Sequence, residues 1–319
     1  MQQTTNSHRG RRWPLLAAAL GTTGALILAN GARAQKAKRD NPPVGRFIEV
    51  DGVKLHYLER GSGPPILLVH GNGVMLQDWL ISGLFDELAK TNRVIAVDRP
   101  GFGHSSRPRG TRWTPERQAD LFAALLKKLD AGNALAVGHS YGALVVAALA
   151  LNHPERLRGI ALLGGYFYPS ARADVLLVAG SAIPGYGDII NRSLMPLMGE
   201  ALQKRINRKI FGPAEPTRRW LREFSWAMAL RPSRMRAGAA DAVHMIPAAR
   251  RLHARYAEIT LPVAILAGTG DRLVDPAGQS ERLHRDLPRS NLTLLDGIGH
   301  MIHQNAPNEV AAALRLLPA

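Results

Sequence analysis

Short apolar runs alternate with helical stretches along most of this chain, and this rhythm constrains the fold more than any other feature of the sequence. Each apolar run has the length of a buried strand, and the stretches between them have the apolar spacing of helices. Such alternation predicts an α/β fold with a mainly parallel sheet and helices on both faces. The predicted strands are 65–69, 93–97, 134–137, 159–163, 262–267 and 291–295, and the predicted helices are 76–90, 114–129, 141–151, 277–287 and 308–316.

A hairpin precedes this pattern at the start of the folded region. Residues 46–50 and 53–59 are predicted strands, and Asp51-Gly52 between them accepts the positive φ of a tight turn. With these two strands the predicted sheet has about eight.

A long interruption divides the pattern after the sixth strand. Between 165 and 256 the alternation stops, and amphipathic segments at 194–210 and 217–230 lie among Pro, Gly and Met residues. A structureless loop of that length is uncommon inside a compact domain. We therefore predict a helical cap over 165–256, inserted into a core made of 46–164 and 257–319.

The run Gly138-His139-Ser140-Tyr141-Gly142 lies between a predicted strand and a predicted helix. A sharp strand-to-helix turn brings the serine backbone close to its neighbours, so the flanking positions must be glycine, and the hydroxyl stays exposed. Because a serine hydroxyl is barely ionised at neutral pH, it needs an imidazole to take its proton and a carboxylate to orient that ring.

Candidates for both partners follow later strands, in the order Ser, Asp, His. Asp271 follows strand 262–267 through Gly268-Thr269-Gly270, and His300 follows strand 291–295 through a Gly-containing turn. In parallel sheets catalytic groups gather at the carboxyl ends of the strands. We therefore predict Ser140 as nucleophile, His300 as general base and Asp271 as the orienting acid. Asp275 is the first alternative for the acid, and Asp296 is the second.

Together these motifs resemble the α/β-hydrolase superfamily over roughly residues 46–316. The resemblance rests on His70-Gly71-Asn72-Gly73, on the run Asp-Arg-Pro-Gly-Phe-Gly-His-Ser at 98–105, on the Ser140 turn, and on Asp271 and Gly299-His300. It implies an esterase- or lipase-like serine hydrolase with an inserted cap. It also implies that the backbone N–H groups of Asn72 and Tyr141 form an oxyanion hole, and the free N–H groups at a helix start suit that role.

The predicted reaction is the cleavage of an ester-like carboxyl derivative of a small molecule through an acyl-enzyme, as in carboxylesterases. Cofactor-free haloperoxidases and carbon–carbon bond hydrolases of this superfamily have a similar triad, and their reactions remain alternatives to ester hydrolysis. Haloalkane dehalogenases and epoxide hydrolases of this fold use a carboxylate nucleophile, whereas this sequence has Ser140. A hydrolase-like protein that binds without turnover, or acts only at lipid surfaces, is the alternative of another class.

No metal or other cofactor is expected. The chain has no cysteine, which excludes disulfides and thiolate metal sites. Its only closely spaced histidine pair is His300 and His303, and the triad uses the first of these. We interpret His303 as a packing residue, and His70, His104 and His139 as residues that order loops by hydrogen-bonding to the backbone.

The cap is strongly basic within a chain of formal net charge +16. Between 201 and 256 it carries 13 Lys or Arg residues against three acids. Such a surface attracts anionic substrates or associates weakly with an anionic membrane. Nucleic-acid binding is not expected, because no nucleic-acid module accompanies the charge.

The first 34 residues resemble a signal peptide. A basic start containing Arg11-Arg12 precedes an apolar run at 14–29, and Ala32-Arg33-Ala34 is the small-x-small pattern that a signal peptidase reads. We therefore expect export to the periplasm or medium, with cleavage before Gln35. An uncleaved N-terminal membrane anchor is the alternative.

Overall fold

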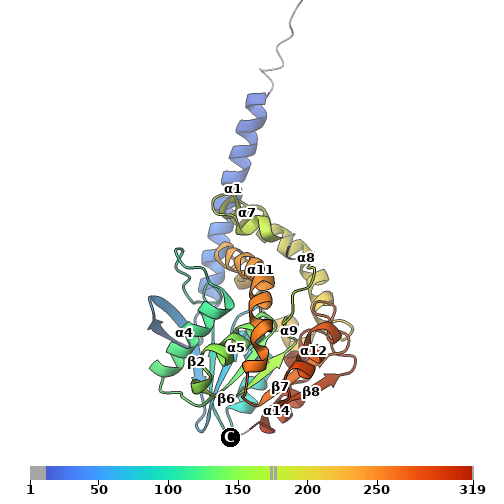
Figure 1. Cartoon of the computed structure of the whole chain (residues 1–319). Coiled ribbons are helices and arrows are strands. Elements are labelled where there is room, and N and C mark those ends of the chain that lie inside the picture. The colour runs from blue at the N-terminus through green and yellow to red at the C-terminus, as the bar shows by residue number, and fades with distance from the viewer. Residues whose placement is uncertain (1–11, 173–174, 176–177, 318–319) are drawn as a thin grey trace, which may run out of the picture.

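An eight-stranded sheet forms the centre of the protein, which we describe from a computed structural model covering residues 12–172, 175 and 178–317 (Figure 1). The strand order is β1-β2-β4-β3-β5-β6-β7-β8, and β3 to β8 are mutually parallel. The α/β fold predicted from the sequence is therefore confirmed. The strands are β1 (Arg46–Val50), β2 (Val53–Arg60), β3 (Pro65–Val69), β4 (Arg93–Val97), β5 (Ala134–His139), β6 (Leu157–Leu163), β7 (Val263–Gly268) and β8 (Ser290–Leu295).

The predicted hairpin is present as an antiparallel edge of the sheet. β1 pairs with β2 from Arg46 opposite Tyr57 to Val50 opposite Val53, and β2 is also antiparallel to β4. Asp51 and Gly52 adopt φ values of 47° and 73° in the turn, as an Asp-Gly pair allows.

Helices cover both faces of the sheet because alternate strand residues point to opposite sides. In β3, Leu67 and Val69 belong to the core beneath α4 (Pro115–Lys128) and α5 (Tyr141–Asn152). Ile66 and Leu68 belong to a second core. It includes residues of α2 (Gln77–Ile81), α3 (Leu84–Leu88), α13 (Ile302–Asn305) and α14 (Pro307–Arg315).

Three predicted helices are divided or modified. The segment 76–90 breaks at Gly83, whose φ of 81° cannot continue a right-handed helix. The segment 217–230 becomes α9 (Arg218–Glu223) and α10 (Trp226–Ala229), because Phe224 and Ser225 are extended and the Ser225 hydroxyl caps α10. The segment 277–287 begins as a π-helical turn and continues as α12 (Arg282–Asp286).

The helices between β6 and β7 lie over the carboxyl edge of the sheet. Besides α9 and α10 they are α7 (Tyr186–Arg192), α8 (Leu194–Phe211) and α11 (Pro232–Leu252). Their underside carries Phe211, Trp220 and Phe224, and the rings of the last two stack at 4.0 Å. These side chains form one apolar cluster with Met75 and Met301 of the core loops.

The described residues before β1 contain one long helix, α1 (Arg12–Asp40), which continues through the predicted cleavage position after Ala34. Its lower half lies beside the cap helices and its upper half projects away from the body (Figure 1). Asn30 is only 3% exposed, and its amide donates to the backbone oxygens of Arg192 and Ser193 at 3.0 and 2.8 Å. None of the helices in the described part of the chain combines the length and apolarity needed to cross a bilayer.

Candidate active site

Ser140 lies in a strained turn between β5 and α5. Its φ of 55° and ψ of −119° are rare for a residue with a side chain, and its N–H donates to Leu163 O at 2.8 Å. A Cβ on Gly138 would lie 2.4 Å from Gly142 O, and one on Gly142 would lie 2.2 Å from Val69 O. Both glycines are therefore required by the packing of the turn, as the sequence predicted, and the serine side chain is partly exposed.

Asp271 is the acid that contacts His300. Its Oδ2 accepts from Nδ1–H of His300 at 2.6 Å, and its Oδ1 accepts from the N–H groups of Leu273 and Val274. Burial alone would raise the pKa of Asp271, but the charge and hydrogen bond of His300 and the two backbone bonds outweigh it, so that the pKa is lowered. Asp275 instead accepts from the backbone of Ala277 and Gly278.

His300 lies against the residues that flank Ser140. Its ring centroid is 4.9 Å from that of His139, and its backbone oxygen accepts from Nε2–H of His139 at 3.0 Å. A Cβ on Gly164 would lie 3.5 Å from its Nδ1, and Gly164 follows the residue that binds the Ser140 backbone. Because the hydrogen bond to Asp271 keeps the proton of the neutral ring on Nδ1, the Nε2 lone pair of His300 is available as a base.

Asn72 and Tyr141 occupy the two positions for which the resemblance implies an oxyanion hole. Tyr141 opens α5, where the first N–H groups have no partner within the helix. Asn72 is exposed in the loop after β3, and its side-chain amide donates to Gly238 O of α11 at 2.9 Å. The loop is thus tied to the cap as well as to the core.

Arg99 donates hydrogen bonds to the backbone of the loop that carries Asn72. Its guanidinium donates to His70 O at 2.9 Å and Gly71 O at 3.2 Å, and its backbone N–H donates to Nε2 of His70 at 3.0 Å. The same guanidinium lies 4.7 Å from the ring centroid of Tyr141. One buried cation therefore contacts both segments whose N–H groups are the oxyanion candidates.

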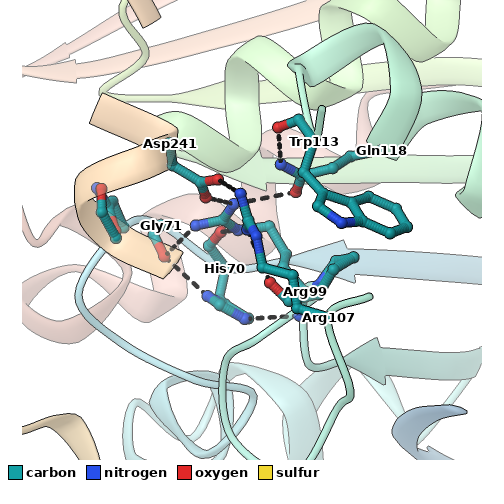
Figure 2. Close-up of polar contacts among 10 residues, drawn as sticks. His70, Gly71, Arg99, Arg107, Trp113, Gln118 and Asp241 are labelled. Atoms are coloured by element: carbon teal, nitrogen blue, oxygen red, sulfur yellow. Dashed lines mark hydrogen bonds and ion pairs between the residues drawn. The ribbon is translucent and has the colours of Figure 1, made fainter. Parts of the chain in front are cut away.

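A buried carboxylate of the cap neutralises this cation. Figure 2 shows Asp241 of α11 between Arg99 and Arg107, with oxygens 2.5 and 2.8 Å from their guanidinium nitrogens. Gln118 also accepts from Arg99, at 3.0 Å. The side chains of Arg99 and Asp241 are fully buried. Sequence reasoning missed this cluster, although Asp241 is a lone acid on an apolar helix face among basic residues.

Arg234 places a further cation beside the same loop. A Cβ on Gly73 would lie 2.8 Å from its guanidinium, so the glycine leaves room for it. Desolvation first, and then the charges of Arg99 and Arg231, lower its pKa to about 10, which still leaves it charged at neutral pH. The loop that carries Asn72 therefore lies between two cations, Arg99 and Arg234.

Three further histidines of the recognised motifs contact backbone oxygens of loops through their ring nitrogens. His70 donates through Nδ1–H to Gly71 O at 2.8 Å, His104 donates to Asn41 O at 3.0 Å, and His139 binds His300 O as described. This confirms the roles expected for the three. His303 packs on Trp79 with ring centroids 4.6 Å apart, which confirms its packing role.

Asp78, His139 and His303 form a buried polar group that the sequence did not reveal. Oδ2 of Asp78 and Nε2 of His303 are 2.9 Å apart but lack hydrogen-bond geometry. Each of the three buried side chains offers one possible ligand atom, and these atoms lie within 4.8 Å of one another. Imidazole nitrogens and a carboxylate oxygen are donor types that zinc accepts.

Known proteins match most of the sheet and the helices around it. The family described as alpha/beta hydrolase fold matches residues 64–307. The chain is similar to 2-hydroxymuconate semialdehyde hydrolase from Pseudomonas sp. (strain CF600), with 36% identity over 40% of this chain and 46% of that enzyme. That match therefore spans less than half the length of the relative.

Two further similarities extend over nearly the entire chain. Haloalkane dehalogenase 2 of Mycobacterium tuberculosis is 28% identical over 86% of this chain and 94% of its own. A structure described as a membrane phospholipase A has a TM-score of 0.66 at 23% identity, covering 95% of this chain and 94% of that one. The uncovered share is smaller than the segment before β1, so this likeness of fold includes part of that segment.

Replacing Asp241 by Asn should lower the free energy of unfolding by about 3 kcal/mol or more, because two buried guanidinium groups would lose their counter-charge. Urea unfolding measures the effect. The matched control is Asp86→Asn, whose carboxylate pairs with Arg60 where both side chains are about half exposed, and it should change stability little. Equal losses for the two variants would contradict the importance of the buried cluster.

His70 should make stability depend on pH in the acidic range. Burial first, and then the charge of Arg99, lower its pKa to about 4 from the ordinary 6.5. Between these two values the unfolded chain binds a proton that the folded protein does not, so stability is lost as the pH falls from about 6.5 to about 4. Unfolding free energies across this range should depend on pH less steeply in His70→Gln, by up to about 1.4 kcal/mol per pH unit. Parallel profiles for variant and wild type would refute this origin.

Proposed function

Because this chain belongs to the alpha/beta hydrolase fold family, we propose that it is a serine hydrolase that cleaves an ester-like carboxyl derivative of a small molecule. The observation that carries the proposal is the pairing of His300 with Asp271 at 2.6 Å beside the strained turn of Ser140. His300 and Asp271, both distant from Ser140 in the chain, pair after β8 and β7, and His300 lies against the neighbouring His139. Such a constellation supports acyl transfer.

In the proposed first step, Ser140 Oγ attacks the substrate carbonyl and Nε2 of His300 accepts its proton. Asp271 stabilises the imidazolium that forms, since its carboxylate holds the proton on Nδ1. The N–H groups of Asn72 and Tyr141 stabilise the oxyanion, and the buried guanidinium of Arg99 keeps both segments in place.

In the second step, His300 returns its proton to the leaving group and the acyl-enzyme remains on Ser140. A water molecule then attacks the acyl carbon with His300 again as base, and the acid product leaves. Every proton transfer uses residues of this chain, and the proposed reaction calls for no cofactor.

Carbon–carbon bond hydrolysis is the second candidate. It is supported by the similarity to 2-hydroxymuconate semialdehyde hydrolase, whose named substrate carries a carboxylate. Arg234 beside the Asn72 loop offers a charge partner for such a group. Perhydrolysis on the same triad is a further alternative, which only product analysis distinguishes.

We also propose export, as the N-terminal sequence predicts, with Gln35 as the first residue of the mature chain. The contacts of Asn30 with the cap support the alternative, in which the helix is retained. Retention would keep α1 packed on α7.

A substrate panel tests the proposed activity. Wild-type protein should hydrolyse p-nitrophenyl esters and should react with a fluorophosphonate probe, while Ser140→Ala should lose at least about a thousandfold in kcat and all labelling. Ser62→Ala, at an exposed loop position, is the matched control and should retain both. A wild-type protein that neither turns over any ester nor reacts with the probe would favour the non-catalytic alternative.

The same panel separates the two candidate reactions. 2-Hydroxymuconate semialdehyde should be a poorer substrate than the esters if the first proposal is right. Arg234→Met should raise KM for that anionic substrate, with little effect on neutral esters, because only a charged substrate loses a partner. Faster carbon–carbon cleavage than ester cleavage would select the second candidate.

N-terminal sequencing of the protein from the periplasm of a bacterial host tests export. Cleavage should yield Gln35 as the first residue. A chain recovered from the membrane fraction with its first 34 residues would show retention. Ala34→Leu should block processing in the first case and change nothing in the second.

A further inference from the structure

A cavity of about 340 Å³ lies between α1 and the cap, apart from the catalytic candidates. Its walls come from α1, from α7 and from the beginning of α11, which lie together in Figure 1. A second cavity of about 240 Å³ shares Lys38, Arg231, Ser233 and Arg236 with it and extends toward the loop after β4. Neither cavity is lined by Ser140 or His300.

Cations dominate the lining of the larger cavity. Five basic side chains line it with one acid, Asp188, and they are Lys38, Arg109, Arg192, Arg231 and Arg236. Asp188 is 3.4 Å from Arg109 and 3.8 Å from Arg236. In the described part of the chain no carboxylate pairs with Lys38, Arg192 or Arg231. Five cations and one carboxylate give the lining a net charge of +4.

The backbone at the start of α11 reinforces this charge. Ser233 lies in the first turn of a helix of 21 residues that has no side-chain cap. Free N–H groups and the positive end of the helix dipole face anions favourably. Arg231, at the N-cap, is 4% exposed, and its guanidinium is fixed by the backbone oxygens of Met228 and Gly103.

Exposed apolar side chains occur on the helices that form the cavity walls. Leu28 of α1 is 77% exposed, next to Ile27 in the cavity lining. Ile183, Tyr186 and Ile189, in and just before α7, are more than half exposed. These four side chains are not in the cavity lining, so the exposed apolar surface belongs to the adjoining helices and not to the cavity itself.

We propose that this cavity binds a phosphate-type oxyanion, carried by a phospholipid headgroup or by a small soluble phosphate. A carboxylate is satisfied by one guanidinium, whereas a phosphate group has the charge and the oxygens to use several. All five cations follow the predicted cleavage position after Ala34, so a processed chain would keep them, but it would lose the part of the wall formed by Ile27, Gly31 and Ala34. The proposed site is independent of the triad.

Matched charge variants of the full chain test the site. In Lys38→Gln/Arg192→Gln, the affinity for inorganic phosphate at low ionic strength should fall by about tenfold or more, as each cation near an anionic group contributes roughly fivefold. Asp188→Asn should increase the affinity several-fold, because it removes the only acid of the lining. Lys127→Gln/Arg285→Gln removes two exposed charges outside both cavities and should bind like wild type.

Calorimetry with phosphate and flotation with vesicles distinguish the two sources. If lipid is the source, vesicles of phosphatidylcholine mixed with phosphatidylglycerol should bind wild type and the control pair but not Lys38→Gln/Arg192→Gln, and phosphate should compete. If soluble phosphate is the source, calorimetry should separate the variants while vesicle binding does not. Both results support the site. Equal behaviour of the two double variants in both assays overturns it, whatever the esterase assay shows.

Discussion

The carboxylate of Asp241 lies between the two guanidinium groups of Arg99 and Arg107 and pairs with both (Figure 2). Because a buried cation without a partner costs several kcal/mol, α11 must lie where its carboxylate reaches the core. Arg99 then uses its remaining donors on the loop that leads to Asn72. The same cluster of charges thus sets the position of α11 and the conformation of the loop that carries Asn72.

The strained turn of Ser140 depends on the sheet around it. A positive φ at a serine costs of order 1–3 kcal/mol and persists only where its surroundings fix it. Here β5 is fully buried, α5 is apolar on every side, and glycines at 138 and 142 permit the close approach of strand and helix. The core therefore fixes the Ser140 turn at the carboxyl end of β5. Asp271 and His300 lie in the loops that follow β7 and β8.

Local patterns predicted the strands well, because each one is an apolar run bounded by turn residues. All eight lie within about three residues of their predicted bounds. The predicted acid and base also lie together, since parallel strands end at one edge. The break at Gly83 was not predicted, because the sequence does not show whether a glycine within an amphipathic pattern adopts a helical or a positive φ. The ion pair of Arg99 with Asp241 joins residues 142 positions apart, which no local pattern encodes.

α11 connects the two charged regions of the molecule. One part of this helix places Arg234 and Gly238 beside the loop of Asn72, where Asp241 pairs with Arg99. Its first turn presents Ser233 to the cationic cavity. A ligand in the cavity shifts the catalytic groups only if α11 can adopt two positions and the ligand binds the protein more tightly in one of them. The buried pair of Asp241 with Arg99 opposes such movement, because any displacement would separate two desolvated charges. A ligand in the cavity would therefore hold the beginning of α11 in place and not move it. We expect it to change the stability of the protein and its binding to the phosphate source, and not the catalytic rate.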